Sequence, residues 1–126
     1  MPITRQHSET EVRELYGKNC EKIIAVVDLD RPTVVYLIYL EVNEIWHRFY
    51  LDAGLLFWDE GTSPNKEEDI LDDEDYLDLG TQFKFVGKTF SLIKMEEREL
   101  VIYFDDNTGL QITEKEDESH FKILSN

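Results

Sequence analysis

The feature that most constrains the fold is a succession of short runs, from Lys22 to the C-terminus, that are rich in β-branched and aromatic residues. Turn-forming residues separate these runs. Segments of this kind favour β-strands, and short turns between them favour antiparallel pairing. The sequence therefore predicts a mainly β (α+β) fold of about eight or nine short strands, as a strongly curved antiparallel sheet, a small barrel or a sandwich.

The first β region spans residues 22–58. Lys22–Leu29 and Thr33–Leu40 flank the turn signal Asp30-Arg31-Pro32, which predicts a hairpin. Because residues 34–40 are apolar at both alternating sets of positions, this strand is expected in the sheet interior, covered on one side by the N-terminal helix or by a second sheet.

The last region, residues 81–125, has the pattern of a β-meander. Its alternating runs are GTQFKFVG, KTFSLIKM, RELVIYF, GLQIT and HFKIL. Asp105-Asp106-Asn107-Thr108-Gly109 begins like a calcium loop but loses the pattern, and we interpret it as a hairpin turn.

A short N-terminal helix is predicted over residues 8–18. Ser8 and Glu11 have the spacing of a capping box, in which each side chain satisfies the other residue's backbone amide. Val12, Leu15 and Tyr16 follow as one apolar stripe, which we expect to contact the rest of the fold.

The acidic connection, residues 59–80, holds ten carboxylates and one lysine. Ser63 and Pro64 have the order of a helix start, which predicts a second short helix from about Pro64 to Asp73. A helix C-terminus disfavours negative charge. A cationic surface would therefore stabilise the predicted binding residues at its end, which are Asp72, Asp73, Glu74 and Asp75.

The chain of 126 residues is expected to form a single domain over 1–126. Its net charge of −15 repels phosphate backbones and anionic lipid, so nucleic-acid and membrane binding are not expected, whereas a basic protein would be attracted. Cys20 is the only cysteine, and neither a signal peptide nor an apolar span of ~20 residues is present. A reducing, cytoplasmic location is the expectation.

No catalytic residue, metal site or cofactor is predicted. His7, His47 and His120 stand too far apart in sequence for zinc-ligand spacing, and glycine-rich phosphate loops are missing. With 28 acidic residues, a close carboxylate pair would arise by chance, so an enzyme with a carboxylate dyad stays an open alternative.

Alternation over Ile45–Leu51 separates two groups of candidate binding residues. Trp46, Arg48 and Tyr50 share one face, and these residue types are common at binding hot spots. The alternative is that a second sheet or the helix covers them, with Arg48 paired to Glu44 or Asp52 on the same face. His47 lies on the other face as a satisfied core histidine or as a polar contact in a ligand pocket.

The leading hypothesis is a non-catalytic binding protein whose acidic connection engages a basic protein. An inhibitor or antidote of a nucleic-acid-acting protein is one version, since carboxylates can occupy a groove that otherwise holds phosphates. The alternatives are a small β-barrel carrier of an apolar ligand, with His47 in its pocket, and the carboxylate-dyad enzyme.

Overall fold

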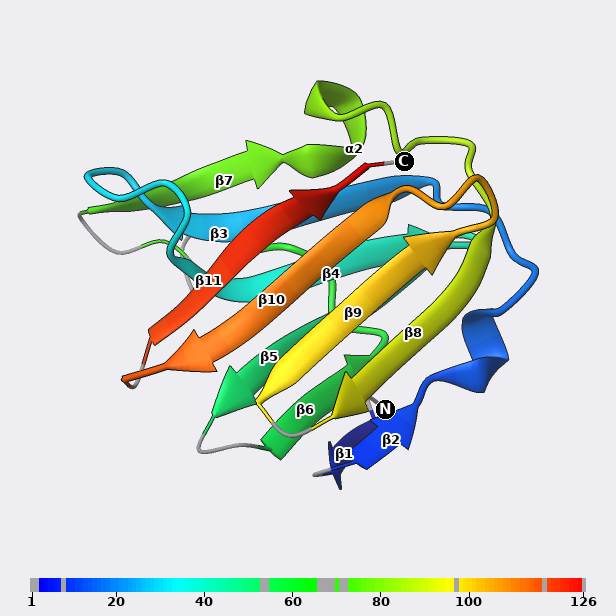
Figure 1. Ribbon diagram of the computed structural model, residues 1–126, viewed down its shortest axis with the longest axis horizontal. Coiled ribbons are helices and arrows are strands. Elements are labelled where there is room, and N and C mark those ends of the chain that lie inside the picture. Colours follow the sequence, from blue (N-terminus) through cyan, green and yellow to red (C-terminus); the bar gives the residue numbers. More distant parts are fainter. Residues whose placement is uncertain are drawn as a thin grey trace.

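Eleven strands lie in two antiparallel sheets in the part of the chain that the structure describes (Figure 1). This computed structural model describes residues 3–7, 9–52, 55–65, 70, 73–96, 98–116 and 118–125. Sheet A has the strand order β1-β6-β5-β4-β3-β7, and sheet B has the order β11-β10-β9-β8-β2. The strands are β1 Ile3–His7, β2 Glu9–Glu11, β3 Lys22–Asp28, β4 Val35–Val42, β5 Ile45–Asp52, β6 Leu55–Glu60, β7 Glu74–Asp78, β8 Phe90–Glu96, β9 Glu99–Phe104, β10 Gly109–Lys115 and β11 Glu118–Leu124.

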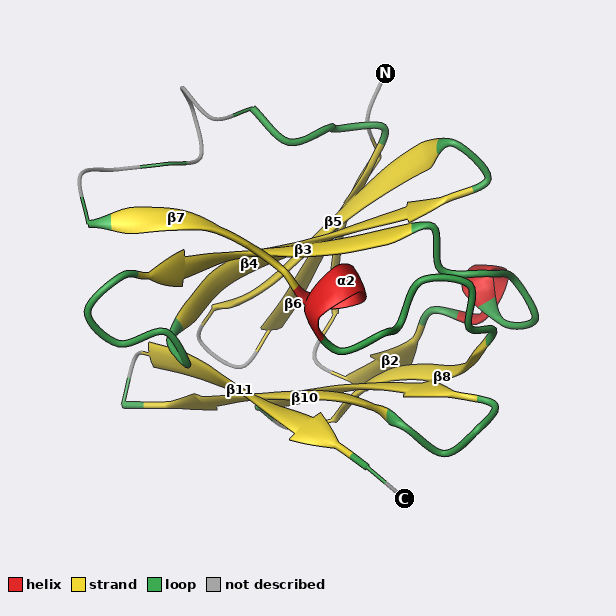
Figure 2. Cartoon of the chain, turned by 90° about the horizontal axis from the view of Figure 1, so that it is seen from above, coloured by secondary structure: helices red, strands yellow, loops and turns green. Residues whose placement is uncertain are grey.

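The two sheets lie face to face, and the core fills the space between them (Figure 2). Strand β9 illustrates the alternation, because Leu100, Ile102 and Phe104 are buried in the core while the residues between them are half-buried. Phe104 packs against Phe85 and Phe90, with ring centroids 4.9 and 5.1 Å apart. The prediction of a mainly β, antiparallel fold is confirmed, and among the alternatives the described strands form two sheets, not a closed barrel.

The first β region has the predicted hairpin. Strands β3 and β4 pair in antiparallel fashion, and β4 is an interior strand between β3 and β5. The next turn is tight, because Asn43 and Glu44 both adopt positive φ, at 52° and 63°. The carboxylate of Glu21 stabilises this turn by accepting hydrogen bonds from both backbone amides, at 3.0 and 2.8 Å.

The predicted N-terminal helix over residues 8–18 is wrong. Glu9–Glu11 form strand β2 against β8, and within residues 9–18 the only helical element is a 3-10 turn at Arg13–Leu15. The amide of Val12 continues the pairing by donating to Ile93 O at 2.8 Å. Hydrogen bonding to the open backbone groups of β8 thus outweighs the local preference for a capped helix. Ser8, the capping residue of the predicted helix, lies outside the described residues.

The apolar stripe of that segment still packs as predicted. Val12 and Leu15 are buried in the core, and Tyr16 packs against it. The Tyr16 hydroxyl donates to Ile93 O at 3.0 Å. The spacing of these residues therefore identified the buried side chains without identifying the backbone conformation.

The predicted strand GTQFKFVG is also wrong. A four-residue helix, α2 (Leu79–Gln82), begins this segment, and Asp78 caps it by accepting from the Thr81 amide at 3.0 Å. Turns follow, with Lys84 at a φ of 61°. Phe85 is nevertheless buried in the core, so the apolar residues of this segment contribute to packing from a loop.

The acidic connection does not contain the expected helix where it is described. Pro64, Asn65 and Ile70 are not helical, while residues 66–69 and 71–72 lie outside the described residues. The backbone from Glu74 to Asp78 is strand β7, paired with β3. The expectation of a helix C-terminus at Asp72 to Asp75 is therefore corrected: Glu74 and Asp75 obtain their backbone partners from sheet A.

Candidate functional site

The acidic residues predicted to bind a partner begin strand β7, at one edge of sheet A. The carbonyl of Asp73 accepts from the Leu29 amide at 2.8 Å, which extends the pairing with β3 by one residue. One carboxylate oxygen of Asp75 accepts from the Tyr76 amide at 2.8 Å. Asp73 is exposed, Glu74 and Asp75 are half-buried, and Asp72 lies outside the described residues. Pairing of their backbone with β3 thus fixes Asp73, Glu74 and Asp75 at the edge of sheet A.

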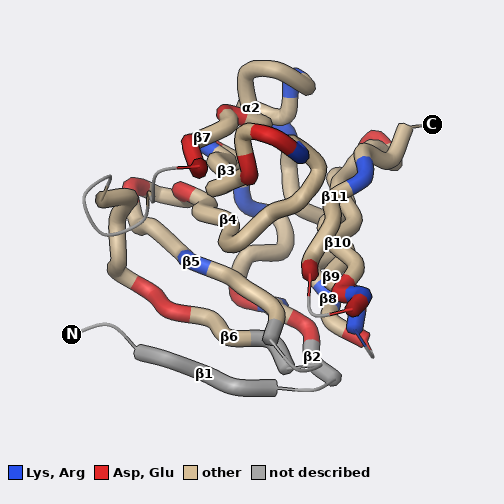
Figure 3. The backbone as a smooth tube through the Cα atoms, turned by 90° about the vertical axis from the view of Figure 1, so that its left-hand side faces the viewer, with Lys and Arg blue, Asp and Glu red and all other residues tan. Residues whose placement is uncertain are grey.

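Negative charge is unevenly divided along the chain. Residues 1–80, which contain all strands of sheet A, carry seven basic and 19 acidic side chains, a net charge of −12. Residues 81–126, which contain four of the five strands of sheet B, carry six basic and nine acidic side chains, a net charge of −3. Figure 3 shows acidic residues along β6 and β7. Residues 1–80 therefore supply most of the attraction for a cation.

Trp46, Arg48 and Tyr50 lie on the face of sheet A that points away from sheet B, as their alternation predicts. Each is half-buried. Tyr50 stacks on Phe57 with ring centroids 4.7 Å apart, and Trp46 meets Tyr39 edge-on at 6.1 Å. The described start of the acidic connection, residues 61–65, runs on this same side of sheet A (Figure 2). The aromatic face and residues 61–65 thus lie on the same side of sheet A.

Arg48 forms an ion pair with Asp59 on the adjacent strand β6, where the register places the two residues opposite each other. The Asp59 side chain is only 6% exposed. Burial opposes the charge of Arg48, but hydrogen bonds to Asp59 and Tyr39 outweigh it and raise the pKa of the guanidinium. Glu44, one of the two acids considered from the sequence, is not the observed partner, and the side chain of Asp52 lies outside the described residues. The Arg48 Nε is buried without a hydrogen-bond partner.

His47 lies on the opposite face of β5, at the core, and is 4% exposed. Its Nδ1 accepts a hydrogen bond from Trp58 Nε1 at 3.2 Å. Burial lowers the pKa of His47, since desolvation disfavours the charged imidazolium. These contacts are those of a satisfied core histidine.

A crevice between the sheets bears on the idea of an apolar-ligand carrier. It is lined by residues that include Val35, Ile38, Phe49, Leu100 and Ile112, and its volume is about 10 Å³. That volume accommodates a single water molecule at most. His47 does not line this crevice, and the described strands do not form the closed barrel that the alternative assumed.

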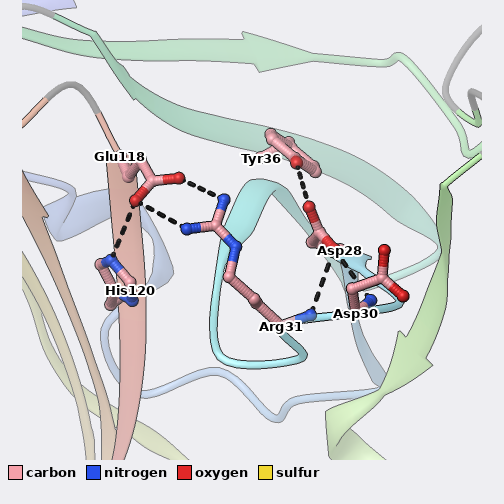
Figure 4. A network of polar contacts seen from close by, with 6 residues as sticks. All are labelled: Asp28, Asp30, Arg31, Tyr36, Glu118 and His120. Atoms are coloured by element: carbon pink, nitrogen blue, oxygen red, sulfur yellow. Dashed lines mark hydrogen bonds and ion pairs between the residues drawn. The ribbon is translucent and has the colours of Figure 1, made fainter.

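A polar network that sequence reasoning missed joins the two sheets at the β3–β4 turn (Figure 4). Arg31 forms a bidentate ion pair with Glu118 of β11, and one of its two contacts measures 3.1 Å. Asp28 accepts from the amides of Asp30 and Arg31 and from the Tyr36 hydroxyl, at 2.9, 3.1 and 3.0 Å. The turn signal at Asp30-Arg31-Pro32 predicted the loop. The contact between Arg31 and Glu118 could not be predicted, because the two residues are 87 positions apart in the sequence.

Metal and thiol chemistry find little support in the described part of the chain. No group of three or more His, Cys, Asp or Glu side chains among these residues is arranged to hold a metal ion. Burial raises the pKa of the Cys20 thiol to about 12, so the nucleophilic thiolate is scarce near neutral pH.

Several carboxylates have lowered pKa values, which is the opposite of what a general acid requires. The pKa values of Glu11, Asp28, Asp106 and Glu118 are all lowered, in each case first by a hydrogen bond from a neighbouring side chain. A general acid needs a raised pKa to hold its proton near neutral pH. These four groups are instead kept ionised.

Comparison with models of known protein families, with curated proteins and with solved structures finds no match for this chain. Among the described residues, no helix has the length and apolar character needed to cross a membrane. The arguments for function therefore come from the geometry and charge described above.

Proposed function

We propose that this protein is a non-catalytic binding module whose acidic sheet A engages a basic protein. The observation that carries the proposal is the division of charge, with −12 on residues 1–80 and −3 on residues 81–126. A one-sided field orients a cationic partner before contact and raises the rate of productive encounter. An inhibitor or antidote of a nucleic-acid-acting protein in the cytoplasm is the version that suits such a surface best.

The neighbouring aromatic face supports the same proposal. Electrostatic attraction speeds association, but lasting affinity depends on aromatic and Arg side chains that lose water on binding. Trp46 and Tyr50 are half-buried and positioned by ring contacts with Tyr39 and Phe57. Side chains held in this way lose little conformational entropy when a partner covers them.

The decisive experiment compares two baits that carry the same net charge. The first bait has Asp73→Asn, Glu74→Gln and Asp75→Asn at the start of β7. The control bait has Glu44→Gln, Asp105→Asn and Glu116→Gln, three exposed carboxylates elsewhere. Each triple change takes the net charge from −15 to −12. Any difference between the baits then reports the position of the charges.

The baits and the unchanged protein are incubated with native cell extract, and each captured basic protein is purified and titrated at low and high salt. We expect the β7 bait to bind it about tenfold more slowly at low salt, with the control close to the unchanged protein. The proposal fails if the captured proteins bind all three equally well, or if none of them is basic.

A further inference from the structure

A shallow concavity of about 230 Å³ lies on the exposed face of sheet B, over strands β8 and β9. This face is turned toward the viewer in Figure 1. Six residues line it, in three cross-strand pairs: Leu92 with Tyr103, Lys94 with Val101, and Glu96 with Glu99. The lining thus changes from apolar at the first pair to acidic at the third.

The acidic end of the concavity has an excess of negative charge. Lys94 Nζ lies 3.3 Å from Glu96 and offsets part of its charge. Glu99 accepts hydrogen bonds only from neutral groups in the described chain, namely Gln111 Nε2 and Thr113 Oγ1. The facing carboxylates of Glu96 and Glu99 repel each other, since like charges directly opposite on a sheet are unfavourable. A further cation beside Glu99 would relieve this repulsion.

The size and polarity of the concavity define its occupant. Sites for whole small molecules measure roughly 300–1,000 Å³, so about 230 Å³ suits one long side chain better. Lys and Arg combine an apolar stem with a cationic head. The stem would lie along Leu92, Val101 and Tyr103, and the head would reach the acidic end.

We propose that this concavity receives a Lys or Arg side chain from a partner protein, with the Glu99 carboxylate as its ion-pair acceptor. The site lies on the opposite sheet from the acidic strand β7. It therefore goes beyond the function proposed above and does not depend on it. A basic partner that used both surfaces would contact both sheets of the module.

The test uses the full chain and a defined probe, N-acetyl-arginine methylamide, titrated while backbone amide shifts are followed by NMR. We expect saturable shifts in β8 and β9, and no saturable shifts with the uncharged citrulline analogue. Glu99→Gln keeps the shape and the hydrogen bonds but removes the charge, so the probe should bind about fivefold more weakly, which is the upper range of an exposed ion pair.

Two further variants keep the result interpretable. Val101→Ser removes apolar contact with the stem and should weaken the probe about twofold. The β7 triple variant should bind the probe as the unchanged protein does. The proposal for the concavity is thereby tested separately from the proposal for the acidic strand β7. Equal affinity in Glu99→Gln, or shifts confined to β7, would overturn the proposal.

Discussion

At the scale of single residues, the three buried polar residues of the described chain, His47, Asp59 and Glu114, each have a partner on a neighbouring strand or turn. Arg48 pairs with Asp59 across β5 and β6, and His47 accepts from Trp58 across the same two strands. Glu114 is buried near Arg98, with 3.3 Å between Oε1 and Nη1. Because an unpaired polar group is costly in the interior, these contacts help to specify which strands lie side by side.

His47 makes stability depend on pH. Burial lowers its pKa in the folded state below the usual value of 6.5, so the unfolded chain binds more protons between the two values. The free energy of unfolding should therefore decrease as the pH falls below about 6.5. In His47→Gln, which keeps an acceptor for Trp58 but does not titrate, this part of the decrease should disappear.

Urea unfolding of both proteins at closely spaced values from about pH 5 to 8 measures the effect. Near pH 8 the imidazole is neutral in both states, so the difference between the two proteins there reports packing alone. Parallel stability curves over the whole range would contradict the assignment.

At the scale of secondary-structure elements, β10 depends on a close backbone approach at its first residue. A Cβ on Gly109 would lie 2.0 Å from the carbonyl oxygen of Ile102 on β9, which forces the backbones apart. Gly17 differs, since a Cβ there meets nothing within 4 Å and only its φ of 82° opposes a side chain. Gly109 is required because strand β9 lies too close for a side chain, whereas Gly17 is favoured only by its left-handed backbone conformation.

We therefore expect Gly109→Ala to lower the free energy of unfolding by about 3 kcal/mol, the upper range for overpacking. Gly17→Ala serves as the matched control and should cost about 1 kcal/mol, the penalty of a left-handed conformation. Urea unfolding of both variants gives the comparison. Equal losses would mean that the β9–β10 hairpin relaxes around the added methyl group.

The edge strand β7 shows how an element can be acidic for a structural reason. Charged residues on an edge strand discourage pairing with other chains. Asp75 adds to this by accepting a hydrogen bond from the Tyr76 amide. The acids of β7 can thus protect a sheet edge as well as attract a partner, and the matched baits described above separate the two roles.

At the scale of the whole molecule, repulsion among the carboxylates opposes the compact state. The net charge of −15 is drawn together on folding, and residues 1–80 carry −12 of it. Ion pairs such as Arg31 with Glu118 and Lys88 with Asp106 act in the opposite direction, but they are partly exposed and contribute little. Repulsion should therefore dominate the response to salt.

Raising the salt concentration from about 0.01 M to 0.1 M shortens the screening length from about 30 to 10 Å. We expect the Tm to rise by a few degrees over this range. The β7 triple variant should start from a higher Tm and gain less. Calorimetry of both proteins tests this, and a Tm that falls with added salt would show that the ion pairs outweigh the repulsion.

Much of the local structure could be predicted from the sequence. The hairpin at Asp30-Arg31-Pro32 and the turn at residues 105–109 follow from residues adjacent in the chain, as their backbone contacts show. The shared face of Trp46, Arg48 and Tyr50 follows from the two-residue period of a strand. The helix over residues 8–18 failed because the capping signal is local, whereas the partner of Glu9–Glu11 is β8.

By itself, the sequence determined the strand-rich character of the chain, the positions of several turns and the concentration of negative charge, because these depend on residue type and on neighbours in the chain. Only the tertiary structure decided that Asp59 pairs with Arg48, that Glu118 reaches Arg31, and that the acids of β7 form a sheet edge. Strand order and register join residues far apart in sequence. The free energy that selects them comes from burying a shared core, which no short segment can do alone.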